Sequence, residues 1–532
     1  MRILVAESLA AEGIAKLREC HEVDERIGLS RDELCRMIPG YDALIVRSQV
    51  RADAELIAAA PRLAVIGRAG VGVDNVDLEA ATRAGIVVVN APTGNTIAAA
   101  EHTLALLYAL ARRIAPADAS VRRGEWERTR FTGVELRGKS LGIVGLGKIG
   151  QAIAVRARAM EMTVLASAPY VTAEQAANVG AELVPFETVL ARSDVLSVHV
   201  PLTRATRGLI GPHALARMKP AALLLNVARG GVVDEAAVAD ALREGRLAGA
   251  AIDVFEHEPP TGSPLLDAPN TVLTPHLGAS TAEAQVAVAE EVADQVLDAL
   301  DGRPARYAVN APLLTPETAQ AIAPYLPLAE TLGRFVAQFA RSAPATLTVD
   351  IAGEIAPFDA APLVAAALRG LLGSVTTERI NLVNAAAIAR ARGITVVERK
   401  SPSAGAYSAV LTLSAEAGAK GSRSGGHLAR VAGTVAAGES RIVRLDDYRL
   451  DMDPADVMLI TRHHDRPGMI GRIGTLLGQA DVNISAMHVA RSAPRADAFM
   501  ILGLDEDPPP SVTAAIREME GIIDVWTIRL AA

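Results

Sequence analysis

The chain has 532 residues, which at roughly 100 to 200 residues per domain excludes one compact core and predicts several domains. Half of the residues are hydrophobic but only 3% are aromatic, so Ala, Val, Leu and Ile must build the cores, as is typical of α/β proteins. The net charge of -8 offers no overall attraction for nucleic acid or for an anionic membrane, and we expect neither as a partner.

The cysteines and the N-terminus indicate a cytoplasmic protein. Cys20 and Cys35 have neither the density of a disulfide framework nor a paired metal-binding spacing, which fits a reducing compartment, and we expect no metal site. The first residues, MRILVAESLAAEGIAKL, carry charges where a signal peptide would be apolar. No later apolar run approaches the ~18 residues that span a bilayer.

Short apolar runs alternate with amphipathic stretches along the first 310 residues, which predicts two α/β units. In the first unit we expect buried parallel strands at residues 3–5, 43–46, 63–66 and 86–89. A long helix over residues 95–113, capped by Asn95 or Thr96, leads into the second unit. That unit is expected to be a doubly wound sheet with strands at residues 140–144, 163–166, 195–198, 222–227, 250–254 and 271–274.

The rest of the chain follows a helix expected at residues 282–300 and a turn cluster at 301–304. Residues 316–450 continue as helices and strands and contain a Gly/Ser-rich segment, 418–426, that favours a mobile loop. Residues 456–532 have the order strand, helix, strand, strand, helix, strand, which is typical of small ferredoxin-like α+β modules.

A glycine-rich motif after the strand at 140–144 predicts a dinucleotide site. Gly145 would permit the tight turn, Gly147 would let the backbone approach a pyrophosphate, and Gly150 would allow close helix packing. The helix that begins here would direct its free amides at the phosphates. The motif is completed by Lys148 and Ile149.

The carboxylate that should accompany this motif is missing. The strand at 163–166 is followed by Ser167, Ala168, Pro169 and Tyr170, so no acid is present to bind the adenosine ribose. Losing that partner should cost on the order of 1.5 to 3 kcal/mol of NAD affinity unless another group replaces it. NAD stays the expected cofactor because no Arg stands beside Ala168, and tolerance of NADP is a hypothesis.

Three charged residues follow predicted strands at the carboxyl edge of the second sheet, where open α/β sheets bind ligands. His276 has the ordinary pKa range of a group that can move a hydroxyl proton, and Glu258 could hold its tautomer. Arg229 could bind a substrate carboxylate with two donors and polarise the adjacent carbonyl. Alone, each could be a packed histidine or a surface charge, but three such residues at three strand ends favour a single site.

The strings VGLGKIG, NVARGGVVDEAAVADAL, AIDVFEHEP and TPHLGASTAEAQ resemble the D-isomer-specific 2-hydroxyacid dehydrogenase family. The resemblance implies catalytic roles for Arg229, Glu258 and His276. It also implies a discontinuous flavodoxin-like substrate domain, residues 1–94 with 285–310, and a Rossmann nucleotide domain, 95–284. Further cofactor contacts are implied at Pro201, Val227, Arg229, Asp253, His276 and Gly278, with Asp253 at the nicotinamide carboxamide and Ala168 where the family has its ribose-binding Asp.

The substrate that the resemblance implies is 3-phosphoglycerate, oxidised with NAD in the first step of L-serine biosynthesis. Its negative charges require local cations, and Arg47 and Arg68, at the ends of predicted strands, match family positions near the substrate. Lesser candidates on the same edge are Ser48, Gly70, Val71 and Asn75. Two alternatives keep other functions open: an NADP-tolerant dehydrogenase of hydroxypyruvate, glyoxylate or 2-hydroxyglutarate, and a sensor that binds nucleotide and amino acid without turnover.

The C-terminal half resembles regulatory domains. Residues 456–532 are similar to the ACT domain, in which an amino acid binds across a subunit interface, and this implies L-serine contacts at His463, Asp465 and Asn483. Residues 316–450, with ALRGLLGSV and INLVNAAAIARARGI, resemble the intervening allosteric domain of long family members. An interface-binding ACT domain and the long helix from residue 95 favour a homodimer or homotetramer.

Overall fold

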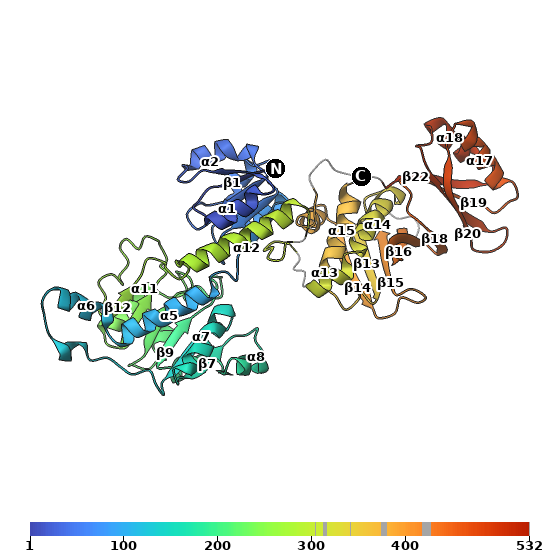
Figure 1. Cartoon of the computed structure of the whole chain (residues 1–532). Helices are drawn as coiled ribbons and strands as arrows, with labels where there is room; N and C mark the ends of the chain where they lie inside the picture. Colours follow the sequence, from blue (N-terminus) through green and yellow to red (C-terminus); the bar gives the residue numbers. More distant parts are fainter. Residues whose placement is uncertain (304, 312–315, 341, 374–379, 418–426, 531–532) are drawn as a thin grey trace.

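The computed structural model describes the chain except for residues 304, 312–315, 341, 374–379, 418–426 and 531–532. The loop expected at 418–426 therefore lies outside the described residues. Four β-sheets follow one another along the chain, and Figure 1 shows them as lobes of an elongated molecule in which the first sheet lies between the second and the third. The predicted class, a multidomain α/β protein with α+β units at its C-terminal end, is confirmed.

The first sheet is parallel, in the flavodoxin-like order β2-β1-β3-β4-β5. Its strands are β1 (Arg2–Val5), β2 (Glu22–Glu25), β3 (Ala43–Val46), β4 (Val65–Arg68) and β5 (Val87–Asn90). The connecting helices are α1 (Ala11–Arg18), α2 (Arg31–Met37) with a short 3-10 turn (Ile38–Gly40), α3 (Ala54–Ala58) and α4 (Leu78–Arg83). Sequence reasoning missed β2 because its residues, EVDE, are polar and only partly buried. It also placed the strand at 63–66 two residues early.

The second sheet is parallel too, in the order β12-β11-β10-β9-β6-β7-β8. Its strands are β6 (Ser140–Val144), β7 (Thr163–Ser167), β8 (Ala181–Leu183), β9 (Val195–Val198), β10 (Leu223–Asn226), β11 (Gly249–Ile252) and β12 (Thr271–Leu273). Between them lie α7 (Lys148–Ala159), α8 (Ala173–Asn178), α9 (Phe186–Arg192), α10 (Pro212–Leu215) and α11 (Glu235–Arg243). This is the doubly wound arrangement that the sequence predicts, with β8 added at one edge.

Two long helices connect the sheets. The expected helix at 95–113 is α5 (Thr96–Ala111), which ends where Arg113 adopts a left-handed backbone (φ +55°) before α6 (Ile114–Arg122) and a 3-10 turn (Arg128–Phe131). Asn95 is the N-cap residue, as the sequence predicts, but its side chain makes no cap hydrogen bond. The second long helix, α12 (Ala282–Leu300), returns from the second sheet to the first (Figure 1). There Val292 and Val296 pack in the core with Ile3.

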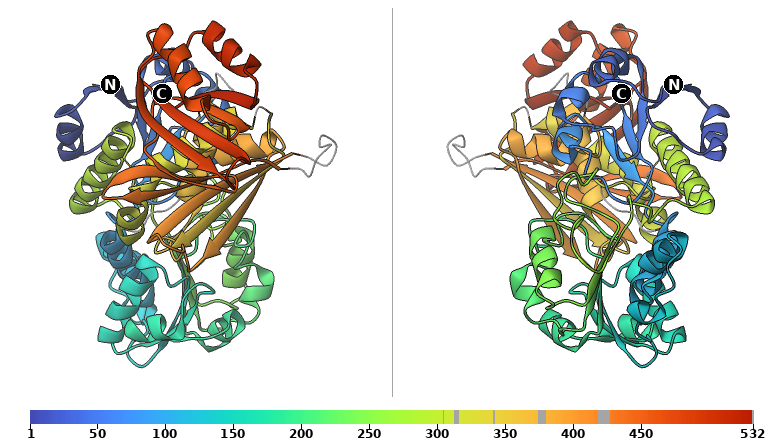
Figure 2. Two further views of the ribbon diagram at one scale, coloured as in Figure 1. Left: turned by 90° about the vertical axis from the view of Figure 1, so that its right-hand side faces the viewer. Right: turned by 90° about the vertical axis from the view of Figure 1, so that its left-hand side faces the viewer.

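The third sheet is mixed, in the order β14-β13-β15-β16-β17-β18, and Figure 2 shows its broad face on the left. It contains β13 (Thr346–Gly353), β14 (Thr395–Ser401), β15 (Ala409–Glu416), β16 (His427–Ala436), β17 (Glu439–Leu445) and β18 (Tyr448–Met452). Its helices are α13 (Pro316–Ile322), α14 (Tyr325–Phe339), α15 (Ala361–Gly373) and α16 (Ala385–Ala391), and α14 packs closely on α15.

The fourth sheet is antiparallel, in the order β20-β21-β19-β22. The chain order is β19 (Val457–His464), α17 (Met469–Gln479), β20 (Ile484–Arg491), β21 (Asp497–Leu504), α18 (Pro510–Glu518) and β22 (Ile522–Arg529). This is the predicted βαββαβ module. One face of the sheet packs against α17 and α18, and the other face shares a core with α14.

The third and fourth sheets therefore meet through apolar side chains. Phe339 of α14 stacks on Trp526 of β22, with ring centroids 4.6 Å apart, and also contacts Phe499 of β21. Phe339 is 5% exposed, and a single cluster of buried residues runs through both sheets. Residues 316–450 and 456–532 thus rest on a common core although the sequence suggests two separate units.

Replacing Phe339 by Ala should lower the free energy of unfolding of this joint unit by about 3 to 5 kcal/mol, because a buried aromatic ring and its stacking are lost. Denaturant unfolding monitored by the fluorescence of Trp526 would measure the change, in a Trp126→Phe background that removes the other tryptophan. The control is Tyr407→Ala, since Tyr407 is 41% exposed. A loss below about 1 kcal/mol for Phe339→Ala would contradict the shared core.

Candidate active site

A cleft of about 1360 Å³ opens between the first two sheets. Both sheets direct the carboxyl ends of their parallel strands into it, together with the start of α7 and part of α12. The predicted residues that line it are Arg47, Ser48, Arg68, Gly70, Val71, Gly147, Lys148, Ile149, Gly150, Pro201, Val227, Arg229, Glu258, His276 and Gly278. The structure thus collects residues from distant parts of the sequence on the two walls of one cleft.

The glycine motif forms the turn between β6 and α7. Gly145 has a left-handed backbone (φ +98°), and a Cβ there would lie 2.5 Å from the carbonyl oxygen of His199. A Cβ on Gly150 would collide with the carbonyl oxygen of Gly145, whereas one on Gly147 would meet nothing within 4 Å. The backbone at Gly147 therefore faces open space at the N-terminus of α7. A pyrophosphate fits this place, because free amides and the helix dipole both favour an anion.

The adenosine end of such a site has no acid after β7. Ala168 is partly buried and packs against the core of the second sheet, and it does not line the cleft. Tyr170, two residues on, is 97% exposed. Lys148, within the motif, has its ammonium group 5.3 Å from the ring centroid of Tyr307.

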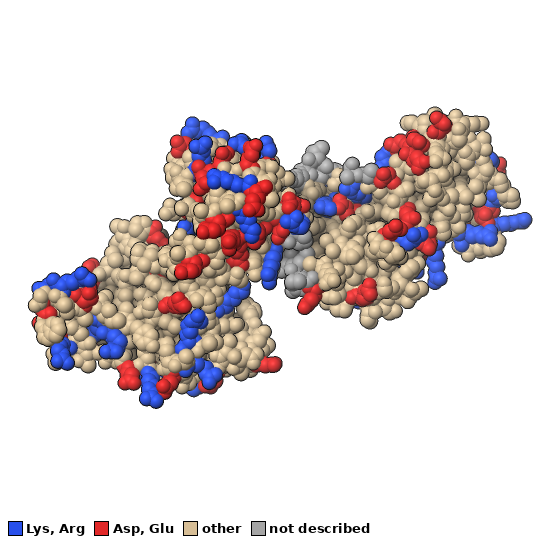
Figure 3. Space-filling model, in the orientation of Figure 1, with Lys and Arg blue, Asp and Glu red and all other residues tan. Residues whose placement is uncertain are grey.

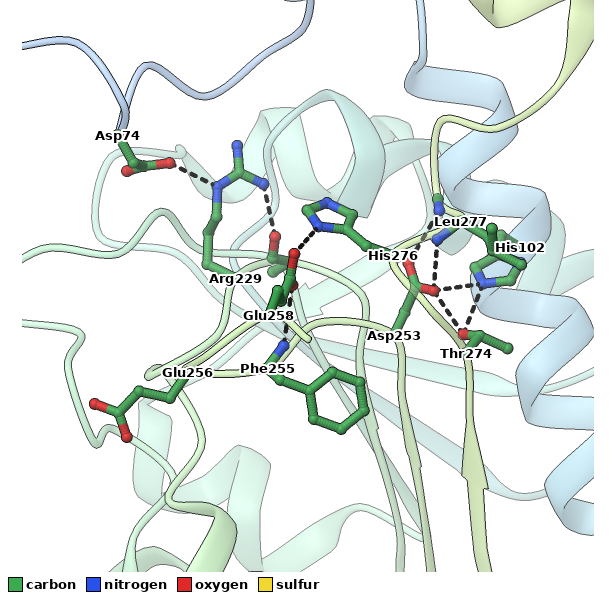
Figure 4. Close-up of polar contacts among 12 residues, drawn as sticks. Asp74, His102, Arg229, Asp253, Phe255, Glu256, Glu258, Thr274, His276 and Leu277 are labelled. Atoms are coloured by element: carbon green, nitrogen blue, oxygen red, sulfur yellow. Dashed lines mark hydrogen bonds and ion pairs between the residues drawn. The ribbon is translucent and has the colours of Figure 1, made fainter. Parts of the chain in front are cut away.

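Asp253 follows β11 and is completely buried. One carboxylate oxygen accepts hydrogen bonds from Leu277 N at 2.8 Å and from Thr274 Oγ1 at 2.6 Å, with His102 Nε2 3.1 Å away; the other accepts from Gly278 N at 2.9 Å (Figure 4). Asp253 does not line the cleft, and both of its carboxylate oxygens are engaged by these contacts within the chain. They hold the backbone turn of residues 276–278.

His276 projects from that turn. Its backbone is left-handed (φ +56°), a conformation that costs energy for a residue with a side chain, and its N–H donates to the Asp253 carbonyl oxygen at 2.9 Å. Its Nδ1 lies 2.8 Å from Glu258 Oε2 (Figure 4). This contact leaves Nε2 for a ligand in the cleft. Burial opposes ionisation of Glu258, but its hydrogen bond to His276 and the charge of His276 outweigh burial, so the pKa of Glu258 lies below its usual range.

Arg229 follows β10 and crosses toward the first lobe. Its Nε donates to Asp74 at 3.0 Å and its Nη1 to the Ala228 carbonyl at 2.7 Å, so the Nη2 donors stay available (Figure 4). The guanidinium lies against Gly72, where a Cβ would collide with it. Asp74 and Gly72 of the first lobe thereby orient the guanidinium of Arg229, which follows a strand of the second sheet.

Arg68, at the end of β4, lies near Arg229. A Cβ on Gly70 would collide with its guanidinium, so the glycine makes room for the cation. Its Nε is buried without a hydrogen-bond partner in the described residues. Burial and the nearby charge of Arg229 lower the pKa of Arg68 to about 10, which leaves it cationic at neutral pH. An enclosed guanidinium with an unused donor fits an anionic ligand.

The residues predicted to bind the effector do not lie together within one copy of the chain. Val457 of β19 and Ile484 of β20 both pair with Leu504 of β21, so these two strands start at the same end of the fourth sheet. Asp465 follows the far end of β19, whereas Asn483 precedes β20. His463 is 2% exposed, and burial lowers its pKa, so the structure does not offer it to a ligand as the sequence suggested.

Sequence reasoning missed several residues that shape the cleft: Glu7, Asp74, His102 and Thr274. Asp74 and Arg229 are 155 positions apart, and His102 and Asp253 are 151 apart. Spacing within a single sequence carries no signal for such pairs. Among the described residues, no group of three or more His, Cys, Asp or Glu is placed to hold a metal ion, and no helix is long and apolar enough to cross a membrane.

Comparisons with known proteins agree with this geometry. Residues 104–278 match the NAD binding domain of D-isomer specific 2-hydroxyacid dehydrogenases, 321–446 match the D-3-phosphoglycerate dehydrogenase intervening domain, and 457–521 match the ACT domain. Solved structures similar to this chain include a protein from Thermus thermophilus (TM-score 0.54, 40% identity, covering 58% of this chain and 100% of that one). A glyoxylate reductase from Paecilomyes thermophila is also similar (TM-score 0.54, 31% identity, covering 58% and 98%).

The fold, the nucleotide turn and the Arg, Glu and His at the strand ends define an NAD-dependent D-2-hydroxyacid dehydrogenase. A D-3-phosphoglycerate dehydrogenase from Synechocystis is 46% identical over 99% of this chain and 95% of its own length. One from Archaeoglobus fulgidus is 44% identical over 100% of both chains. This chain belongs to the D-3-phosphoglycerate dehydrogenase family, and the predicted resemblance is confirmed.

His199, beneath the glycine turn, gives the site a titratable support. Its Nε2 lies 2.7 Å from Ser197 Oγ, and burial lowers its pKa to about 4. The unfolded chain takes up this proton near pH ~6.5, so the stability supported by neutral His199 is complete above that pH. It is lost as the pH falls toward about 4.

We expect the free energy of unfolding to fall by at most about 3 kcal/mol between pH ~6.5 and ~4 on account of His199, since the residue keeps some contact with solvent. Chemical denaturation across this range, for the unaltered chain and for His199→Gln, would measure it. The variant should show a shallower decline, because Gln can still bond to Ser197 but does not titrate. Parallel declines would contradict the assignment.

Proposed function

We propose that the protein oxidises 3-phosphoglycerate to 3-phosphohydroxypyruvate, with NAD as the electron acceptor. The observation that carries this proposal is the joint placement of the His276–Glu258 pair, Arg229 and the two further arginines Arg47 and Arg68 around one cleft. A proton acceptor with its orienting carboxylate suits a hydroxyl group, and several cations suit a substrate with a carboxylate and a phosphate. The family of named relatives points to the same reaction.

The chemistry follows from the roles of three side chains. His276, through the Nε2 that Glu258 leaves available, accepts the C2 hydroxyl proton as the C2–O bond gains double-bond character. Glu258 keeps the other ring nitrogen protonated and stabilises the resulting imidazolium. Arg229 orients the substrate carboxylate through its Nη2 donors and stabilises charge on the C2 oxygen. NAD, bound along the glycine turn, would accept the hydride that leaves C2.

The phosphate end of the substrate is assigned to the wall formed by the first sheet. Arg47, Ser48 and Arg68 line this wall, and Gly70 leaves space for the Arg68 guanidinium. Asn75 does not line the cleft, and its side chain instead donates to the backbone oxygens of Arg47 and Val50. A dehydrogenase of hydroxypyruvate or glyoxylate would not need these cations, and a non-catalytic sensor would not need the His276–Glu258 pair. 2-Hydroxyglutarate has a second anionic group, so its case is judged by the named relatives, which do not favour it.

Replacing His276 by Ala should lower kcat at least ~10²-fold, because proton transfer loses its acceptor, while the dissociation constant for NAD stays nearly unchanged. The assay follows NADH formation with 3-phosphoglycerate, and with D-glycerate and 2-hydroxyglutarate as comparison substrates; NADP replaces NAD in a parallel series. His213→Ala is the matched control, since His213 is exposed on α10. Retained turnover in His276→Ala would refute its role, and an inactive unaltered chain that binds NAD would favour the sensor.

We propose further that residues 316–450 and 456–532 form a regulatory unit beside the substrate domain (1–94 with 285–310) and the nucleotide domain (95–284). L-Serine is the proposed effector, because the C-terminal module matches the ACT domain. Asp465 and Asn483 lie about 30 Å apart along the sheet, from about nine ladder steps of ~3.3 Å between the levels of Ala496 and Asp505. One small amino acid cannot contact both in the same chain.

A second copy of the chain resolves this separation. β20 is an edge strand, and Met487 and Val489 on it are 51% and 36% exposed. If two β20 strands meet in antiparallel fashion about a two-fold axis, Asp465 approaches the partner subunit's Asn483. Exposed apolar residues beyond the ACT module also favour a homodimer or homotetramer; they lie on or after α5 and α6: Tyr108, Ile114, Val121 and Trp126.

Mixed oligomers test this arrangement. Asp465→Ala and Asn483→Ala homodimers should each lose serine binding, whereas a hybrid of the two should recover one intact site out of two, because one interface then keeps both native residues. Titration calorimetry of purified hybrids, carrying different tags, would count the sites. A hybrid with no site would show that the pocket lies within one chain, and unchanged turnover of the unaltered enzyme across a serine titration would remove the regulatory role.

A further inference from the structure

Glu7, two residues after the end of β1, is a buried acid to which the proposed reaction gives no role. Glu7 is only 8% exposed to solvent. The carboxylate accepts hydrogen bonds from Arg47 N at 2.6 Å and Val50 N at 3.1 Å through one oxygen, and from Gln49 N at 3.0 Å through the other. A single side chain thus binds three of the four backbone amides of residues 47–50, which we call the 47–50 loop.

Asn75 holds the same loop from its carbonyl side. Its Nδ2 donates to the Arg47 oxygen at 2.9 Å and to the Val50 oxygen at 2.6 Å. Its own backbone oxygen accepts from Ala52 N at 2.8 Å. Glu7 therefore accepts from the amides of the loop, and Asn75 donates to its carbonyl oxygens. These hydrogen bonds take the place of regular secondary structure and fix the loop backbone.

The loop presents its free groups to the cleft. Arg47, Ser48 and Gln49 all line it, next to Arg68 and Gly70. Arg47 makes one long side-chain hydrogen bond, from Nη1 to the Ser8 oxygen at 3.4 Å, so most of its donors stay available. The amide of Ser48 is the one in the loop that Glu7 does not bind, and it belongs to a residue on the cleft wall.

The negative charge of Glu7 is unfavourable beside a cleft that binds an anion. A buried carboxylate close to a cleft for a dianionic or trianionic substrate repels that substrate, and it acts electrostatically on Arg68. A neutral residue here would avoid this repulsion. The three hydrogen bonds explain why a carboxylate is nevertheless present, because no neutral side chain of this length offers two acceptor oxygens to three amides and so holds the loop in this shape.

We propose that Glu7, together with Asn75, is a positioning residue for substrate specificity: it shapes the 47–50 loop so that Arg47 and Ser48 bind the terminal phosphate. Glu7 itself does not touch the substrate. Its contribution is therefore specific to phosphorylated substrates and leaves the oxidation at C2 unaffected. This inference rests on the proposed oxidation of 3-phosphoglycerate.

The test is Glu7→Gln, which keeps the size of the side chain but turns one acceptor into a donor facing an amide. We expect KM for 3-phosphoglycerate to rise at least tenfold with kcat changed less than threefold. For D-glycerate, which has the same C2 hydroxyl and no phosphate, kcat/KM should change less than threefold. The inhibition constant of inorganic phosphate against 3-phosphoglycerate should rise with KM, which supplies the same comparison if glycerate turns over slowly.

Two further variants keep the proposal open to refutation. Asn75→Ala should reproduce the selective loss if Glu7→Gln fails to fold, because it frees the loop from its other side. Glu12→Gln, an exposed carboxylate on α1, should leave all constants unchanged. Equal losses on both substrates, or no change in the phosphate inhibition constant, would overturn the proposal. Failure of the unaltered chain to oxidise 3-phosphoglycerate would instead refute the proposed function.

Discussion

The buried carboxylate of Asp253 is the interaction on which the geometry of the site depends. It accepts from the two amides that follow His276, and so it holds a turn whose central residue has an unfavourable left-handed backbone. A carboxylate without access to water is costly unless its oxygens are satisfied, and here amides, the Thr274 hydroxyl and His102 satisfy them. His102 lies on α5, so the helix that links the two lobes also supports the catalytic turn.

A second constraint is electrostatic. The molecule carries a net charge of -8, and Figure 3 shows acidic side chains gathered over α12 and the adjoining part of the first lobe. A multiply charged anion must therefore be bound against the sign of the whole protein. The structure answers this locally, by enclosing Arg68 with an unused donor and by directing Arg229 across the cleft with Asp74. Local arrangement of the arginines, rather than total charge, decides which ligand is accepted.

The sequence predicted those features that depend on neighbouring residues. Hydrophobic periodicity located β6, β9 and α12 to the residue, since the two strands are buried runs and the helix is amphipathic, each with clear ends. Periodicity failed at β2 and β8, which are short edge strands with polar or small residues. Strand ends indicated His276 and Glu258, but Asp74, Glu7 and His102 act through partners 40 to 155 positions away, and such pairings follow only from the three-dimensional fold.

Regulation by an effector requires that the ACT module and the cleft be coupled to each other. A ligand at the fourth sheet can slow catalysis only if it binds two arrangements of the chain with different affinities. The third sheet's unit contacts the first lobe in the turn between α4 and β5, where Asn381 Nδ2 donates to the Gly85 oxygen at 2.5 Å. β5 pairs with β4, whose last residue is Arg68, so this contact borders the strand that carries the enclosed cation. The shared core around Phe339 joins the third and fourth sheets, so the ACT module and the segment that contacts this turn belong to one packed unit.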